Sequence, residues 1–225
     1  FKAFFRRCQA GQTPGFPRFK SKRRYDSFSV PGTDAKVNGA RVDLPKLPCL
    51  KVHLYRPLRG KVLQVTVRRE SDGKWSVFFV CDLGAAPPLV SPETVVGIDV
   101  GLKALAVTSD GEFVANPRHA AIGAARLARV QRVAARRKKG SRSKERARRA
   151  VARCYAHIRN QRLDYARKTA ASLVSRYDVV AHEDLNIAGM TRSMLGGSIN
   201  NAGWGILLHC IALKAESAGK HVVAV

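Results

Sequence analysis

The chain has 225 residues, 45% of them hydrophobic, so its length fits one large or two small domains with a substantial apolar core. Its 41 Lys and Arg outnumber 16 Asp and Glu, and this net charge of +25 favours a polyanion as partner, with nucleic acid first. No apolar run is long enough to span a bilayer, no basic amphipathic helix offers a membrane-binding face, and charges interrupt the opening stretch where a signal peptide is apolar.

Residues 1–30 are basic, aromatic and rich in turn-forming Gly and Pro. Cations interleaved with aromatic rings suit phosphate contacts combined with base stacking. A linker whose rings dock on the next domain explains the pattern equally well. The cations that we assign to nucleic-acid contact in this segment are Arg18, Lys20, Lys22, Arg23 and Arg24.

Residues 40–90 predict β structure, in short β-branched and aromatic runs. The Asp72-Gly73 pair between two alternating runs predicts a hairpin. Several short strands at this spacing indicate a small barrel or a curled sheet. The proline-rich residues 84–93 then predict a linker, so we assign residues 1–90 to a basic segment and a small β-barrel-like domain.

Residues 94–116 predict three strands in an antiparallel meander, and Asp99 lies in the first of them. An unpaired carboxylate costs several kcal/mol if it is buried in an apolar strand. Taken alone, Asp99 is most simply explained as a cap for the N–H groups of Gly101 or Leu102.

Residues 119–176 predict two long basic helices around the breaker "GSRS", which together form an antiparallel hairpin. Only Glu145 and Asp164 offset its cations. A charged helix face is usually just solvated, but a face of one sign this dense repels itself unless a polyanion neutralises it. The cations that we assign to nucleic-acid contact here are Arg136, Arg137, Lys138, Lys139, Arg142, Lys144, Arg159 and Arg162.

The remaining residues predict a strand over 178–182 that ends in Glu183 and Asp184, a loop containing Gly196 and Gly197, a helix over about 201–218, and a last strand over 221–225. From residue 94 the order is therefore three strands, helices, strand, helix and strand. This is the element order of an RNase H-like α/β fold, in which the fourth strand returns to pair in parallel with the first.

In that topology Asp99 and Glu183 lie on neighbouring strands, where two carboxylates repel each other unless a cation joins them. Mg²⁺ or Mn²⁺ prefers such ligands and supports phosphodiester hydrolysis. We therefore expect Asp99 and Glu183 to be catalytic, metal-binding residues. Asp184 should point to the other side of the strand end, Asn186 is a weaker candidate, and packing explains His182 better than a role beside the metal.

The motifs "VVGIDVGLKALAV", "NQRLDYARKTAASLVSRYDVVAHEDLNIAGM" and "WGILLHCIALKAESAGKHVVAV", with "GFPRFKSKRR" and "LPKL" upstream, resemble the TnpB-type (OrfB) proteins of insertion sequences. These are RNA-guided relatives of type V CRISPR effectors. The resemblance implies a wedge-like β-domain that grips guide RNA, and a RuvC domain over residues 94–225 whose basic insertion at about 119–176 follows the RNA–DNA heteroduplex. It also implies Asp99 and Glu183 as two of three metal-binding carboxylates.

The chain departs from that family at both ends. The family begins with a strand and a helical domain, and continues into a zinc module and a third catalytic Asp. Because the chain starts at Phe1 and stops before that module, we expect a fragment with impaired activity, and Zn²⁺ only in the C-terminal module. "HED" also stands where the family has an apolar residue before Glu-Asp.

Five scattered cysteines without a C-x-x-C pair argue against a disulfide framework or a zinc site in this chain and favour a reducing compartment. The expected partners are DNA and guide RNA, not a membrane, in a prokaryotic cytoplasm at the nucleoid. A non-catalytic nucleic-acid-binding protein is the alternative, followed by a basic structural protein of unrelated fold. The sequence does not indicate an oligomeric state.

Overall fold

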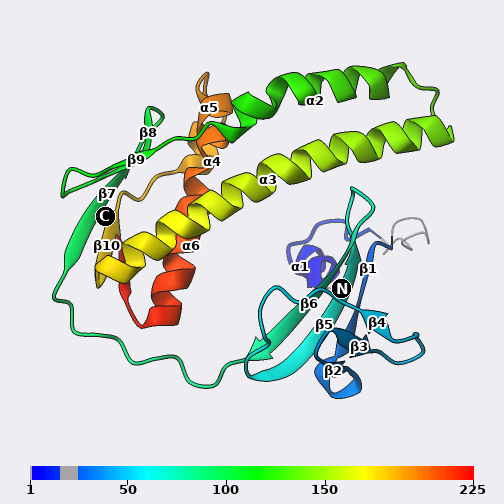
Figure 1. Ribbon diagram of the computed structural model, residues 1–225, viewed down its shortest axis with the longest axis horizontal. Coiled ribbons are helices and arrows are strands. Elements are labelled where there is room, and N and C mark those ends of the chain that lie inside the picture. Colours follow the sequence, from blue (N-terminus) through cyan, green and yellow to red (C-terminus); the bar gives the residue numbers. More distant parts are fainter. Residues whose placement is uncertain (1, 16–24) are drawn as a thin grey trace. The chain divides into compact units, whose positions relative to one another are not determined.

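A computed structural model describes residues 2–15 and 25–225 (Figure 1). The chain forms two compact units, Phe1–Asp82 and Leu83–Val225. In the described part of the chain, no helix has the length and apolar character needed to cross a bilayer. The segment with Arg18, Lys20, Lys22, Arg23 and Arg24 lies outside the described residues.

The first unit holds a short helix and two antiparallel sheets of three strands. One sheet has the order β1-β5-β6 and the other β2-β3-β4. The helix α1 (Lys2–Gln9), which the sequence did not predict, buries none of its residues. The other elements are β1 (Ser27–Pro31), η2 (Gly32–Asp34), β2 (Lys36–Asn38), β3 (Arg41–Asp43), β4 (Leu50–Lys51), β5 (Lys61–Arg69) and β6 (Trp75–Asp82).

A small apolar core joins these two sheets. Val42 of β3 and Leu44, which directly follows β3, pack with Val65 and Val67 of β5, and all four side chains are buried. Val65 and Val67 share a face because side chains alternate along a strand. The predicted hairpin is confirmed: β5 and β6 pair on either side of Gly73, whose φ is 91°.

The second unit is built on a five-stranded sheet with the order β11-β10-β7-β8-β9. The predicted meander is confirmed, because β7 pairs antiparallel with β8, and β8 with β9. The later strand β10 pairs in parallel with both β7 and β11, as crossover connections require. The strands are β7 (Val95–Val100), β8 (Ala104–Thr108), β9 (Phe113–Ala115), β10 (Val179–His182) and β11 (His221–Ala224).

Five helices complete this unit: α2 (His119–Arg136), α3 (Arg142–Arg176), α4 (Ile187–Met190), α5 (Gly196–Ala202) and α6 (Trp204–Ala218). The predicted loop at Gly196 and Gly197 is wrong, because both residues belong to α5. The helix expected over about 201–218 is divided by Gly203, whose φ of 79° ends α5 and lets α6 start in a new direction. A side chain at Gly196 would collide with the carbonyl of Thr191, so only Gly allows this approach.

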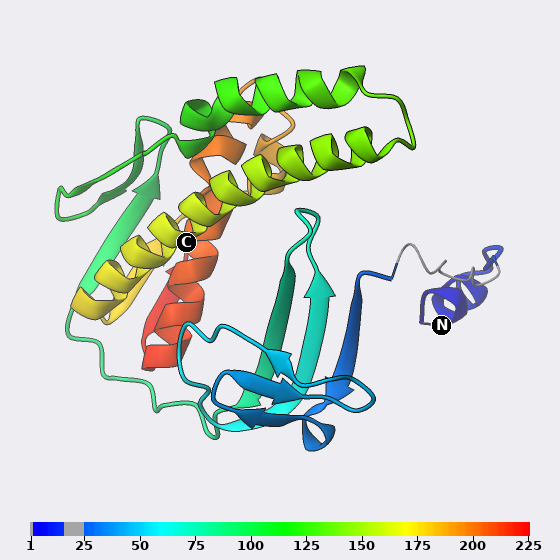
Figure 2. The ribbon, with the colours of Figure 1, turned by 45° about the vertical axis from the view of Figure 1, so that its right-hand side comes forward.

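One face of the sheet packs against α3 and α6, which lie side by side in both views (Figures 1 and 2). The last part of α3 belongs to this core, whereas its first part continues beyond the sheet and pairs with α2 as the predicted hairpin. The side chains at the centre of the core, all almost fully buried, are Val96, Val180, Ala170, Leu173, Leu207 and Ile211.

Candidate functional site

Asp99 lies at the carboxyl end of β7, and its side chain is exposed. Its neighbours Val96 and Ile98 are 0% and 4% exposed and face the helices. Because side chains alternate across a strand, Asp99 projects on the other side from Ile98, away from α3 and α6. An apolar strand tolerates this carboxylate because it avoids the core.

Glu183 directly follows β10 and is also exposed. β10 and β7 pair in parallel with a constant register that ends at His182 opposite Ile98. The next position along the two strands is therefore Glu183 opposite Asp99. In a parallel pair, equivalent positions lie side by side, so this register brings the backbone positions of Asp99 and Glu183 together at the carboxyl edge of the sheet.

The two carboxylates are the type of ligand that a divalent cation prefers. Mg²⁺ is commonly held by one or two carboxylates, with water and substrate phosphates completing the coordination. Asp99 and Glu183 supply two carboxylates, and their exposure leaves room for the other ligands. Within residues 2–15 and 25–225, no group of three or more His, Cys, Asp and Glu is placed to hold a metal.

The polar residues beside Glu183 have local roles. His182 places Nδ1 2.9 Å from the carbonyl oxygen of Glu183. The backbone N–H of Asp184 donates to the carbonyl of Val225 (2.9 Å). Asn186 caps α4 by accepting a hydrogen bond from the N–H of Gly189 (2.9 Å). The cap accounts for Asn186, which had been a weak candidate ligand.

The turn that follows Asp99 is held from two directions. The indole N–H of Trp204, at the start of α6, donates to the carbonyl of Gly101 (3.0 Å). Asn116 donates through Nδ2 to the carbonyl of Leu102 (3.0 Å). Trp204 is only 5% exposed, so this contact connects the carboxylate-bearing strand to the helical core. The apolar pattern of the last helix predicts a core position for Trp204, but neither it nor Asn116 carries a sequence signal for this contact, because both are distant in sequence from Asp99.

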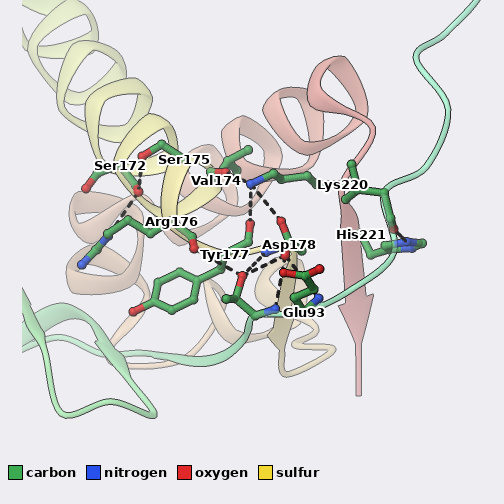
Figure 3. A network of polar contacts seen from close by, with 11 residues as sticks. Glu93, Ser172, Val174, Ser175, Arg176, Tyr177, Asp178, Lys220 and His221 are labelled. Atoms are coloured by element: carbon green, nitrogen blue, oxygen red, sulfur yellow. Dashed lines mark hydrogen bonds and ion pairs between the residues drawn. The ribbon is translucent and has the colours of Figure 1, made fainter.

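A second polar cluster lies at the opposite, amino ends of the same strands (Figure 3). The carboxylate of Asp178 accepts hydrogen bonds from Thr94 Oγ1 (3.0 Å) and the Thr94 N–H (3.2 Å), and pairs with Lys220 Nζ (3.2 Å). Lys220 and Thr94 hold the pKa of Asp178 at about 2. Lys220 also donates to the carbonyl of Val174 (2.9 Å). This cluster anchors α3, β7 and β11, and leaves the carboxyl ends of the strands as the open edge.

The charge of the second unit is concentrated in the helical hairpin. Residues 119–176 hold 18 Lys and Arg against two Asp and Glu, whereas the rest of residues 83–225 hold five Lys and Arg against eight Asp and Glu. The two hairpin acids, Glu145 and Asp164, pair with cations four residues further along α3, at 3.3 Å and 2.7 Å. The hairpin is thus a strongly cationic element on an otherwise slightly acidic unit.

The hairpin cations named in the sequence analysis fall into two groups. Lys144 and Arg162 have intramolecular partners: Lys144 Nζ donates to the carbonyl of Ala134 (2.6 Å), which closes the tip of the hairpin. The side chains that are exposed to solvent are Arg136, Arg137, Lys138, Lys139, Arg142 and Arg159. The other exposed hairpin cations are Arg126, Arg129, Arg132, Arg146, Arg148, Arg149, Arg153, Arg167, Lys168 and Arg176.

Arg162 differs from the other hairpin cations because it lies against the junction of α5 and α6. Its Nη2 donates to the carbonyl of Asn200, and Gly203 has no side chain to displace the guanidinium. Burial lowers the pKa of Arg162. Arg162 therefore packs inside the unit. The basic pattern of the sequence does not distinguish such an arginine from one at the surface.

Residues 64–194 match the family OrfB_IS605, described as "Probable transposase". The chain belongs to this family. The match includes both carboxylates and the whole helical hairpin, whereas Trp204 and Lys220 lie beyond its last residue.

Two curated relatives agree with this assignment. The chain is 31% identical over 219 residues to a "Putative RNA-guided DNA endonuclease" of Streptomyces pristinaespiralis, which covers 93% of the chain and 53% of that protein. It is 29% identical to the "Putative RNA-guided DNA endonuclease InsQ" of Escherichia coli (strain K12), with 100% of the chain and 59% of that protein covered. The chain thus spans little more than half the length of these relatives.

A solved structure shows the same mixed α/β fold. The structure titled "Cryo-EM structure of the Cas12f1-sgRNA-target DNA complex" matches 73% of the chain and 36% of its own chain, with a TM-score of 0.52 and 15% identity. At this identity the likeness concerns the fold alone.

Proposed function

We propose that this chain is part of a transposon-encoded, RNA-guided DNA endonuclease with an RNase H-like (RuvC) sheet. The observation that carries the proposal is the register of β7 and β10, which makes Asp99 and Glu183 neighbours at the carboxyl edge of the sheet. Ligands of open α/β sheets bind at this edge. The names of the curated relatives support the same activity.

Asp99 and Glu183 bind the divalent cation and fix its place relative to the strand ends. A Mg²⁺ or Mn²⁺ ion held by these two carboxylates would supply Lewis-acid chemistry for phosphodiester hydrolysis. Trp204 and Asn116 hold the turn after Asp99, so that this carboxylate stays at the edge. Exposure of both carboxylates leaves the DNA phosphate access to them.

The helical hairpin supplies the sequence-independent affinity. Its exposed cations bind backbone phosphates of the RNA–DNA heteroduplex and release counterions. The rest of the second unit is slightly acidic, so its affinity for DNA comes from the hairpin and the metal. DNA binding and DNA cleavage thus depend on different residues of this unit. The first unit acts as a wedge-like domain that contacts guide RNA. The complex of protein and guide RNA cleaves DNA at the nucleoid.

A non-catalytic nucleic-acid-binding protein is the second candidate. It is supported by the set of ligands: in the described part of the chain, no third carboxylate, His or Cys joins Asp99 and Glu183. The same hairpin would then bind nucleic acid without cleaving it.

Cleavage assays separate these candidates. The chain, and a chimera in which it replaces the matching residues of the full-length Streptomyces relative, are purified with the RNA that accompanies them and given DNA complementary to that RNA with Mg²⁺. We expect Asp99→Ala and Glu183→Ala to abolish cleavage, and Asp184→Ala, the adjacent exposed carboxylate, to retain it. Cleavage that survives both site changes refutes the nuclease, and RNA binding without any cleavage by either protein supports the second candidate.

A further inference from the structure

An aromatic pair stands on the surface of the first unit, between β4 and β5. The Tyr55 side chain is 92% exposed. Its ring centroid lies 4.6 Å from that of His53, with 31° between the ring planes. A ring this exposed has one face supported by the imidazole and leaves the rest of its surface in contact with water.

The backbone explains why both rings point outward. Val52 packs against the small core, and its N–H donates to the carbonyl of Ala40 (2.8 Å). Burial then alternates: Val52 and Leu54 are half-buried, whereas His53 and Tyr55 are exposed. Residues two apart in an extended segment share a side, so anchoring Val52 and Leu54 presents His53 and Tyr55 together.

The sequence on either side of this pair carries charge of one sign. Residues 44–69 contain seven Lys and Arg and no Asp or Glu. Arg56 and Arg59 follow Tyr55 directly in the same loop, and both are exposed. A supported aromatic ring beside cations matches the chemistry of a nucleotide, which has a flat base to stack and a phosphate to pair.

We propose that Tyr55, supported by His53, stacks on an unpaired nucleobase while Arg56 and Arg59 contact the adjoining phosphates. This inference rests on the proposed nucleic-acid function and adds a binding site outside the helical hairpin. The base is unpaired because the faces of bases inside a duplex are already stacked on one another. Preorganisation by His53 lowers the entropy that Tyr55 loses when the base binds.

The test uses the full chain and single-stranded oligonucleotides that carry 2-aminopurine, as RNA and as DNA, with a duplex of the same sequence as a third probe. We expect quenching of the 2-aminopurine fluorescence on binding of a single strand and none with the duplex. Tyr55→Ala should remove the quenching and weaken single-strand binding about 5- to 150-fold. Tyr55→Phe keeps the ring and should retain both, and comparison of the RNA and DNA probes identifies the strand that the site prefers.

A charge control separates stacking from electrostatics. Arg56→Gln should keep the quenching and reduce the slope of log affinity against log salt by about 0.7, the value for one phosphate of a single strand. Tyr55→Ala should leave that slope unchanged. If the unaltered chain binds none of the probes, the proposed function fails; if it binds them and Tyr55→Ala behaves identically, the stacking site fails alone.

Discussion

Replacing Leu207 with Ala removes a side chain that lies wholly inside the core of the second unit. Leu207 on α6 is 0% exposed and belongs to the cluster that covers one face of the sheet carrying Asp99. The change therefore tests whether α6 and the carboxylate-bearing strand fold as one structure.

The expected cost follows from burial on all sides. Deleting a buried leucine side chain loses its transfer free energy and leaves a cavity, together about 2–5 kcal/mol. The sheet and two helices around Leu207 limit collapse of that cavity, so we expect the free energy of unfolding to fall by about 4 kcal/mol. With a urea m-value of about 1–3 kcal/mol/M, the unfolding midpoint should fall by about 1–4 M.

The chain's two tryptophans make this measurable for one unit at a time. Trp204 is buried in the second unit, and Trp75 is 62% exposed in the first. In a Trp75→Phe background, Trp204 fluorescence in urea reports unfolding of the second unit. Circular dichroism at 20 °C or below verifies that the variant is folded before unfolding begins.

Leu213→Ala is the matched control, because Leu213 lies on the same helix and is 49% exposed. It should cost less than about 1 kcal/mol. Equal shifts for the two leucine variants, or no shift for Leu207→Ala, would refute the packing of α6 described above.

Three further results are expected. Lys220 and Thr94 hold the pKa of Asp178 at about 2, below its ordinary 3.8, so the stability that they contribute is present above pH 3.8 and is lost as pH falls through about 2. The melting temperature of Asp178→Asn should therefore fall less steeply with decreasing pH than that of the unaltered chain. Parallel curves of melting temperature against pH for the two proteins would contradict this role of Asp178. Ser141→Ala removes the side-chain cap of α3, so amide exchange at the hairpin tip should accelerate by a factor that corresponds to about 0.5–2 kcal/mol, and unchanged exchange would exclude that cap. Replacing Arg136, Arg137, Lys138 and Lys139 with Gln should lower the salt slope of duplex binding by up to about 3.6, whereas an intact slope would exclude these residues from phosphate contact.

Local sequence signals were sufficient for much of the fold. The Asp72-Gly73 turn specified the β5–β6 hairpin, and a breaker between two basic periodic segments specified α2 and α3. The pattern missed the break at Gly203, because a single Gly within an apolar helical pattern can be tolerated inside a helix and so does not by itself mark an end. The short helix α1 buries none of its residues, and the turn-forming Gly11, Pro14 and Gly15 that follow it hid it in the sequence.

The site could be predicted only in part. Alternation along β7 places Asp99 and Ile98 on opposite faces of the sheet, but it does not show which face the helices cover. The position of the helices decides whether the carboxylate is buried or exposed. The register of Glu183 beside Asp99 depends on how the chain returns to β7, which residue spacing does not fix. The role of Arg162 was also not predictable, because an arginine that packs against Asn200 has the same sequence pattern as the exposed cations beside it.

Mn²⁺ binding to the chain tests the central claim, that Asp99 and Glu183 form one cation site, independently of cleavage. Electron paramagnetic resonance titrations would compare the unaltered chain with Asp99→Asn, Glu183→Gln and the double variant, with Asp184→Asn as control. If the two carboxylates share one ion, each single change lowers affinity about 10-fold or more and the double change adds little, because either loss already disables the site. Unaltered affinity in both single variants, or losses that simply add, would contradict the account.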